Sequence, residues 1–167
     1  MTHAPTPAPF RVHSLTADVD RTAFDSGSAP LDRYLREQVS QDLRRRVAAC
    51  FVALDAVDRI AGYYTLASAS VPLQGLPAAV ARKLPRYPAV PAVRMGRLAV
   101  DQAYAGRGLG AALLADALQR AAKAEIAAYA LIVDAKDLKA SAFYRHHGFL
   151  PLPDSPLSLF FPLASVP

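Results

Sequence analysis

Hydrophobic residues recur along the chain with two different periods, and each period predicts a type of secondary structure. Between residues 30 and 46 they repeat every fourth position, which predicts a helix that begins at Pro30 and ends near Arg46. Between Leu109 and about Ala124 they occupy one face of a second predicted helix, opposite charged and amide side chains. The hydrophobic positions are Leu31, Leu35, Val39 and Leu43 in the first helix, and Leu113, Leu114, Ala117, Leu118 and Ala121 in the second.

Short runs rich in β-branched and aromatic residues predict strands around these helices. The segment Asp55–Arg59 separates the first two runs and is expected to form a hairpin turn. Asp137 can cap a short helix that ends at Gly148, since glycine readily adopts the left-handed conformation after a helix. The predicted strands are Ala48–Leu54, Ile60–Ser68, Met95–Asp101, Tyr129–Val133, Phe149–Leu152 and Leu157–Leu163. The chain is therefore expected to form a mixed α/β domain.

Prolines divide the chain, because each one removes a backbone donor and interrupts regular structure. Nine precede residue 92 and five follow residue 150, with none between. The proline-free block Ala92–Leu150 should therefore hold the continuous helices and strands. The connector before it, from Pro72 to Pro91, is expected to be a loop with one short helix near Leu76–Leu84.

Length and composition restrict the class of protein. With 167 residues, 53% of them hydrophobic, the chain fits one globular domain, expected over residues 10–167 behind a flexible tail at residues 1–9. It has no run of the roughly 18 apolar residues that a membrane span needs, and its start lacks a signal-peptide pattern, so we expect a cytoplasmic protein. Cys50 is the only cysteine, which excludes a disulfide within the chain and a thiolate zinc site, and no metal is expected. The net charge of +5 allows a polyanionic partner.

Three of the eight glycines lie together in Gly106-Arg107-Gly108-Leu109-Gly110, between a predicted strand and a predicted helix. Backbone N–H groups without neighbouring Cβ atoms can approach a ligand closely, and the first helical turn adds unpaired donors, so we favour phosphate binding over a merely structural tight turn. A nucleotide P-loop requires Lys-Ser/Thr after its last glycine, whereas Ala111-Ala112 follow here. The dinucleotide fingerprint fits Gly106-x-Gly108-x-x-Ala111, but only 33 residues follow the acidic Asp134, too few for the remaining strand–helix units.

These segments resemble the GNAT acetyltransferases, whose coenzyme motif joins a strand, a loop of the form Gln/Arg-x-x-Gly-x-Gly/Ala and a helix. The matching segments are Arg97–Asp101, Tyr104–Gly110 and Leu113-Leu114, followed by a second signature at Asp134–Asp137, Ala140, Phe143-Tyr144 and Gly148-Phe149. The resemblance implies the GNAT fold, a mixed and mostly antiparallel central sheet flanked by helices, with acetyl-CoA as cosubstrate.

The same resemblance implies which residues bind the coenzyme. Ala105 departs from the pattern, because the family usually has Gln or Arg at this position. Since the family grips the pyrophosphate mainly through backbone N–H groups, the departure implies weaker outer contacts and not lost binding. The implied coenzyme-binding residues are Leu98, Ala99, Val100, Ala105, Gly106, Arg107, Gly108, Leu109, Gly110, Ala111, Asp137 and Tyr144.

Further segments are similar to the GNAT toxins of type II toxin–antitoxin systems. They are Phe24–Gly27, Leu31-Asp32-x-Tyr34-Leu35, Gly62–Leu66, Leu84–Tyr87 with Pro91, and Gly96–Asp101. This narrower resemblance implies acetylation of the α-amine of aminoacyl-tRNA, which stops translation, with a small ribbon-helix-helix antitoxin as partner, and it leaves a homodimer open. A protein or small-molecule amine is the alternative acceptor. A noncatalytic acyl-CoA-binding module is the alternative of a different class.

The resemblance also implies direct acetyl transfer without a covalent enzyme intermediate. A backbone N–H of Leu98–Val100 would stabilise the developing oxyanion, and Tyr144 is the expected general acid that protonates the departing thiolate. The base stays open, because an α-amine with a pKa of about 7.7–8.0 needs only a weak or water-mediated base. Asp101 either orients such a water or only caps the turn after its strand. Cys50 begins an apolar run without a nearby histidine and is interpreted as buried packing.

Five basic residues lie between positions 82 and 97 with no acidic residue among them: Arg82, Lys83, Arg86, Arg94 and Arg97. Tyr87 offers a stacking surface in the same stretch. We interpret this group as a contact surface for RNA, with ordinary solvated surface as the alternative. Arg44-Arg45-Arg46 suit either RNA contact or charge compensation at the end of the first helix, and both interpretations stay open.

Overall fold

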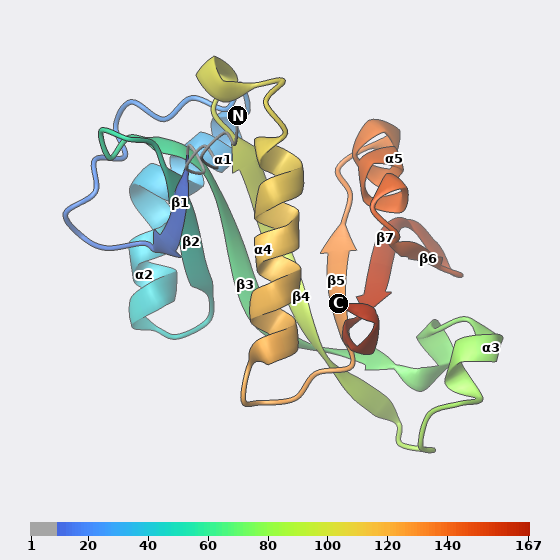
Figure 1. Cartoon of the computed structure of the whole chain (residues 1–167). Helices are drawn as coiled ribbons and strands as arrows, with labels where there is room; N and C mark the ends of the chain where they lie inside the picture. The colour runs from blue at the N-terminus through green and yellow to red at the C-terminus, as the bar shows by residue number, and fades with distance from the viewer. Residues whose placement is uncertain (1–9) are drawn as a thin grey trace, which may run out of the picture.

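A seven-stranded sheet forms the centre of the computed structural model, which describes residues 10–167 (Figure 1). The strands lie in the order β1-β2-β3-β4-β5-β7-β6, and every neighbouring pair is antiparallel except β4 and β5. The strands are β1 (Arg11–Ser14), β2 (Ala49–Leu54), β3 (Ile60–Pro72), β4 (Ala89–Val100), β5 (Ala130–Asp134), β6 (Leu150–Leu152) and β7 (Ser155–Pro162). The predicted mixed, mostly antiparallel sheet is confirmed.

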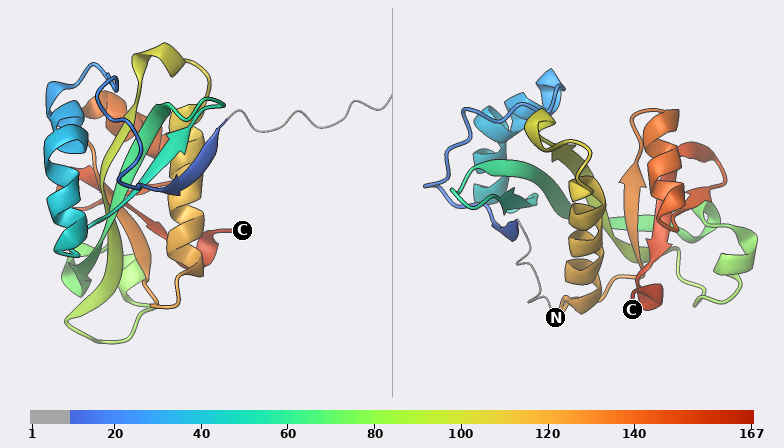
Figure 2. Two further views of the ribbon diagram at one scale, coloured as in Figure 1. Left: turned by 90° about the vertical axis from the view of Figure 1, so that its left-hand side faces the viewer. Right: turned by 45° about the horizontal axis from the view of Figure 1, so that its top comes forward.

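Helices cover both faces of this sheet (Figure 2). On one face, α4 packs through Leu109, Leu113 and Leu114 onto β3 and β4, and α5 contributes Tyr144 to the same core cluster. On the other face, α1 and α2 pack against β2 and β3, while α3 covers the far ends of β3 and β4. The helices are α1 (Ala29–Arg33), α2 (Val39–Arg44), α3 (Ala78–Ala81), α4 (Leu109–Lys123) and α5 (Leu138–His146).

A glycine allows α4 to approach the sheet closely. A Cβ at Gly62 on β3 would lie 2.8 Å from a methyl carbon of Leu113 and 2.9 Å from the carbonyl oxygen of Ala99. Any larger residue would therefore force helix and strand apart. Close packing at this point fixes the position of the N-terminal half of α4 relative to β4, and so the position of the loop between them.

The parallel pair β4–β5 separates before its end. Its pairing runs from Ala92↔Ala130 to Met95↔Val133, whereas β4 continues to Val100. Beyond Met95, β4 pairs only with β3, and β5 ends while paired with β7. One edge of the last residues of β4 is therefore free of a strand partner, which leaves main-chain groups available to a ligand in the gap.

The first helical segment differs from the single regular helix that the hydrophobic repeat predicts. Residues Tyr34–Gln38 form a π-helical turn between α1 and α2, and the regular helix ends at Arg44 rather than Arg46. The i, i+4 repeat of hydrophobic residues does not reveal this turn. One inserted residue rotates the following side chains around the helix axis, but the hydrophobic residues still lie four positions apart in the sequence.

The proline boundaries are also partly wrong, since β3 ends at Pro72 and β4 includes Pro91. The carbonyl of Pro91 accepts a hydrogen bond from Tyr129, directly before β5 begins. In another residue, the N–H at this position would point to the same side as the carbonyl. The neighbouring strand β5 has not yet begun there, so proline is tolerated. The sequence pattern also missed β1, while the expected short helix near residues 76–84 is limited to Ala78–Ala81. The flexible tail expected at residues 1–9 lies outside the described residues.

Candidate active site

The glycine-rich turn before α4 leaves its backbone donors free. Gly106 and Gly108 have φ angles of +77° and +75°, a conformation that other residues rarely adopt. Beyond the adjacent residues, no atom lies within 4 Å of the place where either Cβ would be. No side chain caps α4. Across the described residues, the N–H groups from Gly106 to Ala111 donate to no acceptor in the chain. The turn thus presents a row of unpaired donors at the positive end of a helix, an arrangement that suits phosphate.

A cleft of about 720 Å³ opens in front of this turn, a volume typical of ligand sites. It is bounded by the free end of β4, by the start of α4 and by α5, so it lies over the gap between β4 and β5. Its lining is Ser26, Leu98, Val100, Gln102, Tyr104, Ala105, Gly106, Gly108, Leu109, Gly110, Lys136, Asp137, Lys139, Ala140, Phe143 and Tyr144.

The structure brings most of the predicted coenzyme-binding residues together in this cleft. The exceptions are Ala99, Arg107 and Ala111. Ala99 packs on the opposite face of the sheet, and Arg107 is exposed with its guanidinium 5.5 Å from the centre of the Tyr104 ring. Ala111 lies inside the first turn of α4. These three residues can contribute main-chain groups or outer charge, but their side chains do not shape the cleft.

Sequence reasoning missed several residues of the cleft. Lys136 and Lys139 add positive charge beside the turn, and Ser26 comes from a segment far away in sequence. The main chain holds that segment in place, because Gln102 N–H donates to the carbonyl of Asp25 at 2.9 Å. Lys136 lies within the second matched signature and could have been found there, whereas no local pattern places Ser26 at the cleft.

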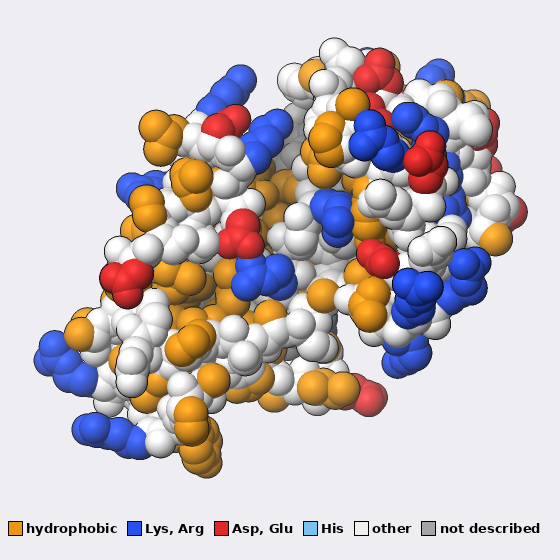
Figure 3. Space-filling view, turned by 180° about the vertical axis from the view of Figure 1, so that it is seen from behind, with side chains coloured by type: hydrophobic (Ala, Val, Ile, Leu, Met, Phe, Trp, Pro, Cys, Tyr) orange, Lys and Arg blue, Asp and Glu red, His pale blue; other side chains and the backbone are white. Residues whose placement is uncertain are grey.

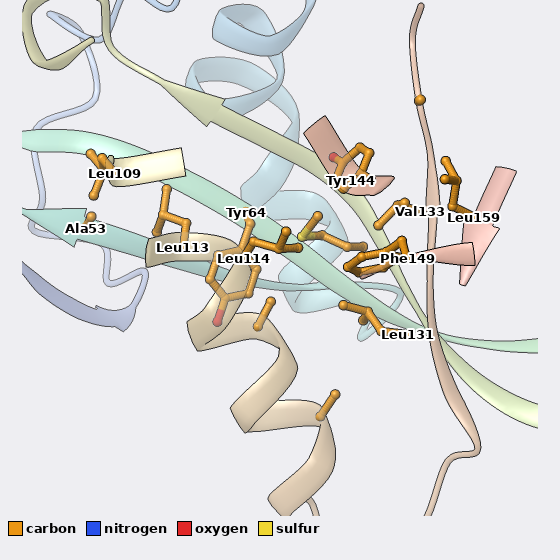
Figure 4. Packing of buried hydrophobic residues seen from close by; sticks show 14 of the residues in the cluster. Ala53, Tyr64, Leu109, Leu113, Leu114, Leu131, Val133, Tyr144, Phe149 and Leu159 are labelled. Carbon is orange, nitrogen blue, oxygen red and sulfur yellow. The ribbon is translucent and has the colours of Figure 1, made fainter. Parts of the chain in front are cut away.

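Tyr144 lines the cleft and is 8% exposed. Its ring packs 5.3 Å from Phe143 and 5.5 Å from Phe149, at one end of the cluster that also holds Val133 and Leu159 (Figure 4). Burial raises the pKa of the phenol to about 12, so it stays protonated at neutral pH. The hydroxyl has no hydrogen-bond partner among the described residues, and it is not enclosed. It is therefore available to a molecule in the cleft.

A second, smaller cavity of about 120 Å³ meets the cleft at this point. Both cavities are lined by Leu98, Lys136, Ala140 and Tyr144. The smaller one also includes Leu31, Gly96, Arg97 and Asp134, which belong to the other side of the sheet. The gap between β4 and β5 thus gives access to Tyr144 from both faces, so two molecules can meet there without entering from the same side.

Asp101 lies apart from this meeting point. Its carboxylate accepts hydrogen bonds from Ala103 N–H at 2.8 Å and from Asp25 N–H at 3.0 Å, and the residue is 6% exposed. It lines a different cavity, together with Phe24 and Ile60, and the structure does not bring it to Tyr144. Of the two interpretations of Asp101, these contacts favour the cap of the turn at residues 102–104 over an oriented water.

Cys50 is buried in the cluster between β2 and the first helical segment. Burial raises the pKa of its thiol to about 12, which keeps the reactive thiolate absent at neutral pH. In residues 10–167, no group of three or more His, Cys, Asp or Glu side chains is placed to hold a metal ion. The same residues contain no helix long and apolar enough to cross a membrane.

The structure divides the five basic residues of the 82–97 stretch into two groups. Arg94 and Arg97 lie on β4 beside the smaller cavity, where Arg94 pairs with Asp134 and Arg97 stacks on Tyr34. The other three, Arg82, Lys83 and Arg86, are exposed in the loop that follows α3. Between Ala89 and Arg97 the strand spans about 25 Å, so the groups are not one compact patch.

The face of the molecule opposite α4 carries both groups. It is hollowed between the first helical segment and the C-terminal strands, with hydrophobic side chains in the hollow and both basic and acidic side chains around it (Figure 3). Arg44, Arg45 and Arg46 are exposed at the end of α2, and Arg46 has a φ of +57° as the chain turns into β2. The exposed Lys and Arg side chains on this face suit contact with an extended polyanion.

Comparisons with known proteins agree with this geometry. The model of the acetyltransferase (GNAT) family matches residues 13–149. A "tRNA-acetylating toxin" of Mycobacterium tuberculosis is 40% identical over 142 residues, which cover 84% of each chain.

Among solved structures, the toxin AtaT complexed with acetyl-methionyl-tRNAfMet superimposes with a TM-score of 0.88 at 31% identity, covering 94% of this chain and 96% of that one. A tyrosine-to-phenylalanine mutant of AtaT, bound to the C-terminus of the antitoxin AtaR and to acetyl-CoA, gives a TM-score of 0.78 at 30% identity. It covers 94% of this chain and 95% of that chain.

Proposed function

Because the chain belongs to the acetyltransferase (GNAT) family, we propose that it transfers the acetyl group of acetyl-CoA to the α-amine of aminoacyl-tRNA and thereby acts as a toxin that blocks translation. The observation that carries this proposal is the meeting of the two cavities at Tyr144, one framed by free backbone donors and the other by basic side chains. The similarity to a tRNA-acetylating toxin supports the choice of acceptor.

The coenzyme side would be held mainly through the main chain. The free N–H groups from Gly106 to Ala111 would bind the diphosphate, and Lys136 and Lys139 add positive charge nearby. Apolar contacts from Leu98, Val100 and Phe143 suit the chain that leads to the thioester. Bound in this way, the thioester would lie toward Tyr144 and the free edge of β4.

The transfer then needs two contributions from the protein, a proton donor for the sulfur and hydrogen-bond donors for the oxyanion. The neutral amine attacks the carbonyl carbon of the thioester, the C–S bond breaks, and the sulfur takes the hydroxyl proton of Tyr144 while the nitrogen loses one proton to solvent. Main-chain N–H groups on the free edge of β4, in the stretch Leu98–Val100, are the donors for the developing oxyanion. The two proton steps balance once solvent reprotonates the phenolate.

An α-amine is a better acceptor for this site than a lysine side chain. The carboxylates near the two cavities already have partners. Asp134 in the smaller cavity pairs with Arg94, and Asp137 in the cleft caps α5. Asp101 accepts two backbone hydrogen bonds. The site therefore relies on an amine that is partly neutral at physiological pH, with a pKa of about 7.7–8.0 rather than about 10.4. The aminoacyl ester of a charged tRNA supplies such an amine.

We propose that the basic face binds the acceptor RNA. Arg97 beside the smaller cavity would contact the phosphates nearest the reacting amine, and Arg82, Lys83 and Arg86 more distant ones. The neutralised pair Arg94–Asp134 would contribute less to the electrostatic attraction.

The partners follow from the same proposal. AtaT binds the C-terminus of its antitoxin AtaR, and we propose an antitoxin of the ribbon-helix-helix class for this chain. A homodimer is compatible with the proposal, since it would extend the basic surface for one tRNA. Action on charged tRNA places the enzyme in the cytoplasm, where translation takes place.

The decisive experiment offers purified protein and labelled acetyl-CoA to matched tRNA pools, one aminoacylated and one deacylated. We expect label on the aminoacylated pool alone, and much slower labelling of that pool with Tyr144→Phe. Equal labelling of both pools, or label on added protein or polyamines instead, would replace the tRNA with another amine acceptor. Binding of acetyl-CoA without transfer to any amine would indicate a noncatalytic module.

A further inference from the structure

We propose that Tyr34 is a positioning residue for the acceptor, because it holds the guanidinium of Arg97 flat and directs its N–H edge toward an RNA phosphate. The inference rests on the proposed function, since it assumes that the acceptor is a polyanion. Tyr34 itself is 2% exposed and is not expected to touch the substrate. It would act on the acceptor only through Arg97.

A β-bulge places Arg97 on the acceptor side of the sheet. In the pairing of β3 with β4, Thr65 faces Arg97 and Leu66 faces Met95, so Gly96 is an extra residue without a partner. The extra residue reverses the alternation of side chains along β4. Leu98 therefore joins Met95 on the α4 side, while Arg97 and Ala99 face the first helical segment.

Tyr34 fixes the Arg97 guanidinium without cancelling its charge. The central carbon of the guanidinium lies 3.4 Å from the centre of the Tyr34 ring, which is close contact for a cation on an aromatic face. Within the described residues Arg97 has no carboxylate partner, whereas Arg94 is paired with Asp134. A stacked guanidinium keeps all its N–H donors at its edge, where they are free for a phosphate.

Two contacts in turn hold the ring of Tyr34 in place. Its hydroxyl donates a hydrogen bond to Asp42 at 2.8 Å, and its face stacks on Tyr63 with 6.5 Å between ring centres. In a regular α-helix, residues eight apart point about 80° away from each other. The π-helical turn at Tyr34–Gln38 absorbs one extra residue, so Tyr34 and Asp42 come within about 20° of the same direction. The irregular turn is thus what allows this hydrogen bond.

Arg97 is placed where a fixed guanidinium can position the substrate. Arg97 lines the same small cavity as Leu98 and Tyr144, on the side away from α4. A phosphate bound at its edge would lie close to the point where the amine must arrive. A fixed donor pair would therefore set how far the end of the RNA enters, in addition to attracting it.

The test measures tRNA binding by fluorescence anisotropy without acetyl-CoA, over a range of salt concentrations, for wild type, Tyr34→Leu, Arg97→Gln and Arg97→Lys. Because a cation–π contact and its positioning effect are modest, we expect Tyr34→Leu to weaken binding roughly 3- to 30-fold. The slope of log affinity against log salt should fall by about 0.7 in Tyr34→Leu and in Arg97→Gln, the loss of one single-strand phosphate contact. In the double variant the two effects should not add.

Tyr64→Leu is the matched control, because Tyr64 is an equally buried tyrosine on the α4 side of the sheet and is stacked on neither Arg97 nor Tyr34. It should lose stability but keep the wild-type salt slope. Arg97→Lys keeps the charge without the planar fork, and we expect it to bind nearly as weakly as Arg97→Gln. This variant does not disturb the core, so it tests the inference even if Tyr34→Leu does not fold.

Two results would overturn the inference: a wild-type salt slope in folded Tyr34→Leu, or wild-type binding by Arg97→Lys. Neither result bears on acetyl transfer itself, which the labelling of charged tRNA by the wild-type enzyme tests separately. Conversely, if charged tRNA binds the wild-type protein but receives no acetyl group, the proposed function is contradicted and the role of Tyr34 in binding is not.

Discussion

The two faces of the sheet approach Tyr144 with different means of binding. On the α4 side, the groups offered to a ligand are main-chain donors at a glycine turn, set by two positive φ angles and by the packing of α4 on β3. On the α1 side, they are arginine side chains oriented by an aromatic ring or by a carboxylate. Binding on the α4 side should tolerate most side-chain changes and be lost when the backbone conformation changes. Binding on the α1 side should depend on single charges and on the salt concentration.

The largest effect is expected where the two faces meet. Tyr144→Phe removes the proposed proton donor, and we expect kcat to fall by about 10²–10⁴-fold with little change in the affinity for acetyl-CoA. Because burial raises the pKa of the phenol to about 12, the wild-type kcat should not decline through ionisation of Tyr144 below about pH 11. Steady-state kinetics from pH 6 to 10 and calorimetric titration check both points. A kcat near wild type would assign the proton to another donor.

On the coenzyme face, a change of backbone should matter most. Gly108→Val places a β-branched residue at a φ of +75°, which distorts the turn, and we expect the affinity for acetyl-CoA to fall roughly tenfold or more. Gly75→Val is the control, because its φ is not positive and its Cβ would meet no atom closer than 3.8 Å. Titration calorimetry on both variants checks the prediction, and equal affinities would show that the turn does not hold the diphosphate.

The acceptor face should respond to charge instead. Replacing Arg82, Lys83 and Arg86 together by Gln should weaken tRNA binding roughly tenfold at physiological salt and reduce the salt slope by up to about 2, because up to three phosphate contacts are lost. The three side chains are exposed, so the fold should be unaffected. The affinity for acetyl-CoA serves as the internal control and should match wild type. An unchanged salt slope would assign these residues to ordinary solvated surface.

The smallest kinetic effect is expected at Asp101, which lies at neither cavity of the site. Asp101→Asn weakens the hydrogen bonds to Ala103 and Asp25 and should lower the free energy of unfolding by about 1–2 kcal/mol. The kcat should stay within about threefold of wild type, since capping, not proton transfer, is lost. Denaturant unfolding and kinetics separate the two roles. A large loss of kcat in a stable variant would instead support the interpretation that Asp101 orients a water molecule.

Local patterns in the sequence were enough to predict most of the residues that line the cleft in front of α4. The glycine run, the amphipathic helix behind it and the tyrosine of the second signature lie within one continuous part of the chain, and each has a local signal. The structure places them around one cleft. The role of Asp101 could not be resolved in this way, because its partner Asp25 is distant in sequence.

The acceptor side could be predicted only as a count of charges. The run from Arg82 to Arg97 reads as one basic stretch, yet Arg94 is paired with Asp134 and Arg97 with Tyr34, and the remaining three lie at the far end of β4. Neither partner is near in sequence. The bulge at Gly96 and the π-helical turn at Tyr34–Gln38 also have no periodic signal, since each is a single inserted residue in an otherwise regular pattern.

For this protein, the sequence by itself determined most of the elements, the order in which they occur and the glycine-rich turn before α4. These depend on hydrophobic period and on the dihedral freedom of glycine, which are properties of neighbouring residues. Tertiary structure alone decided where β4 and β5 separate, which arginines keep a free charge and that Tyr144 is reached from both faces. These depend on contacts between residues far apart in the chain, which form only when the sheet and its two helical layers pack together.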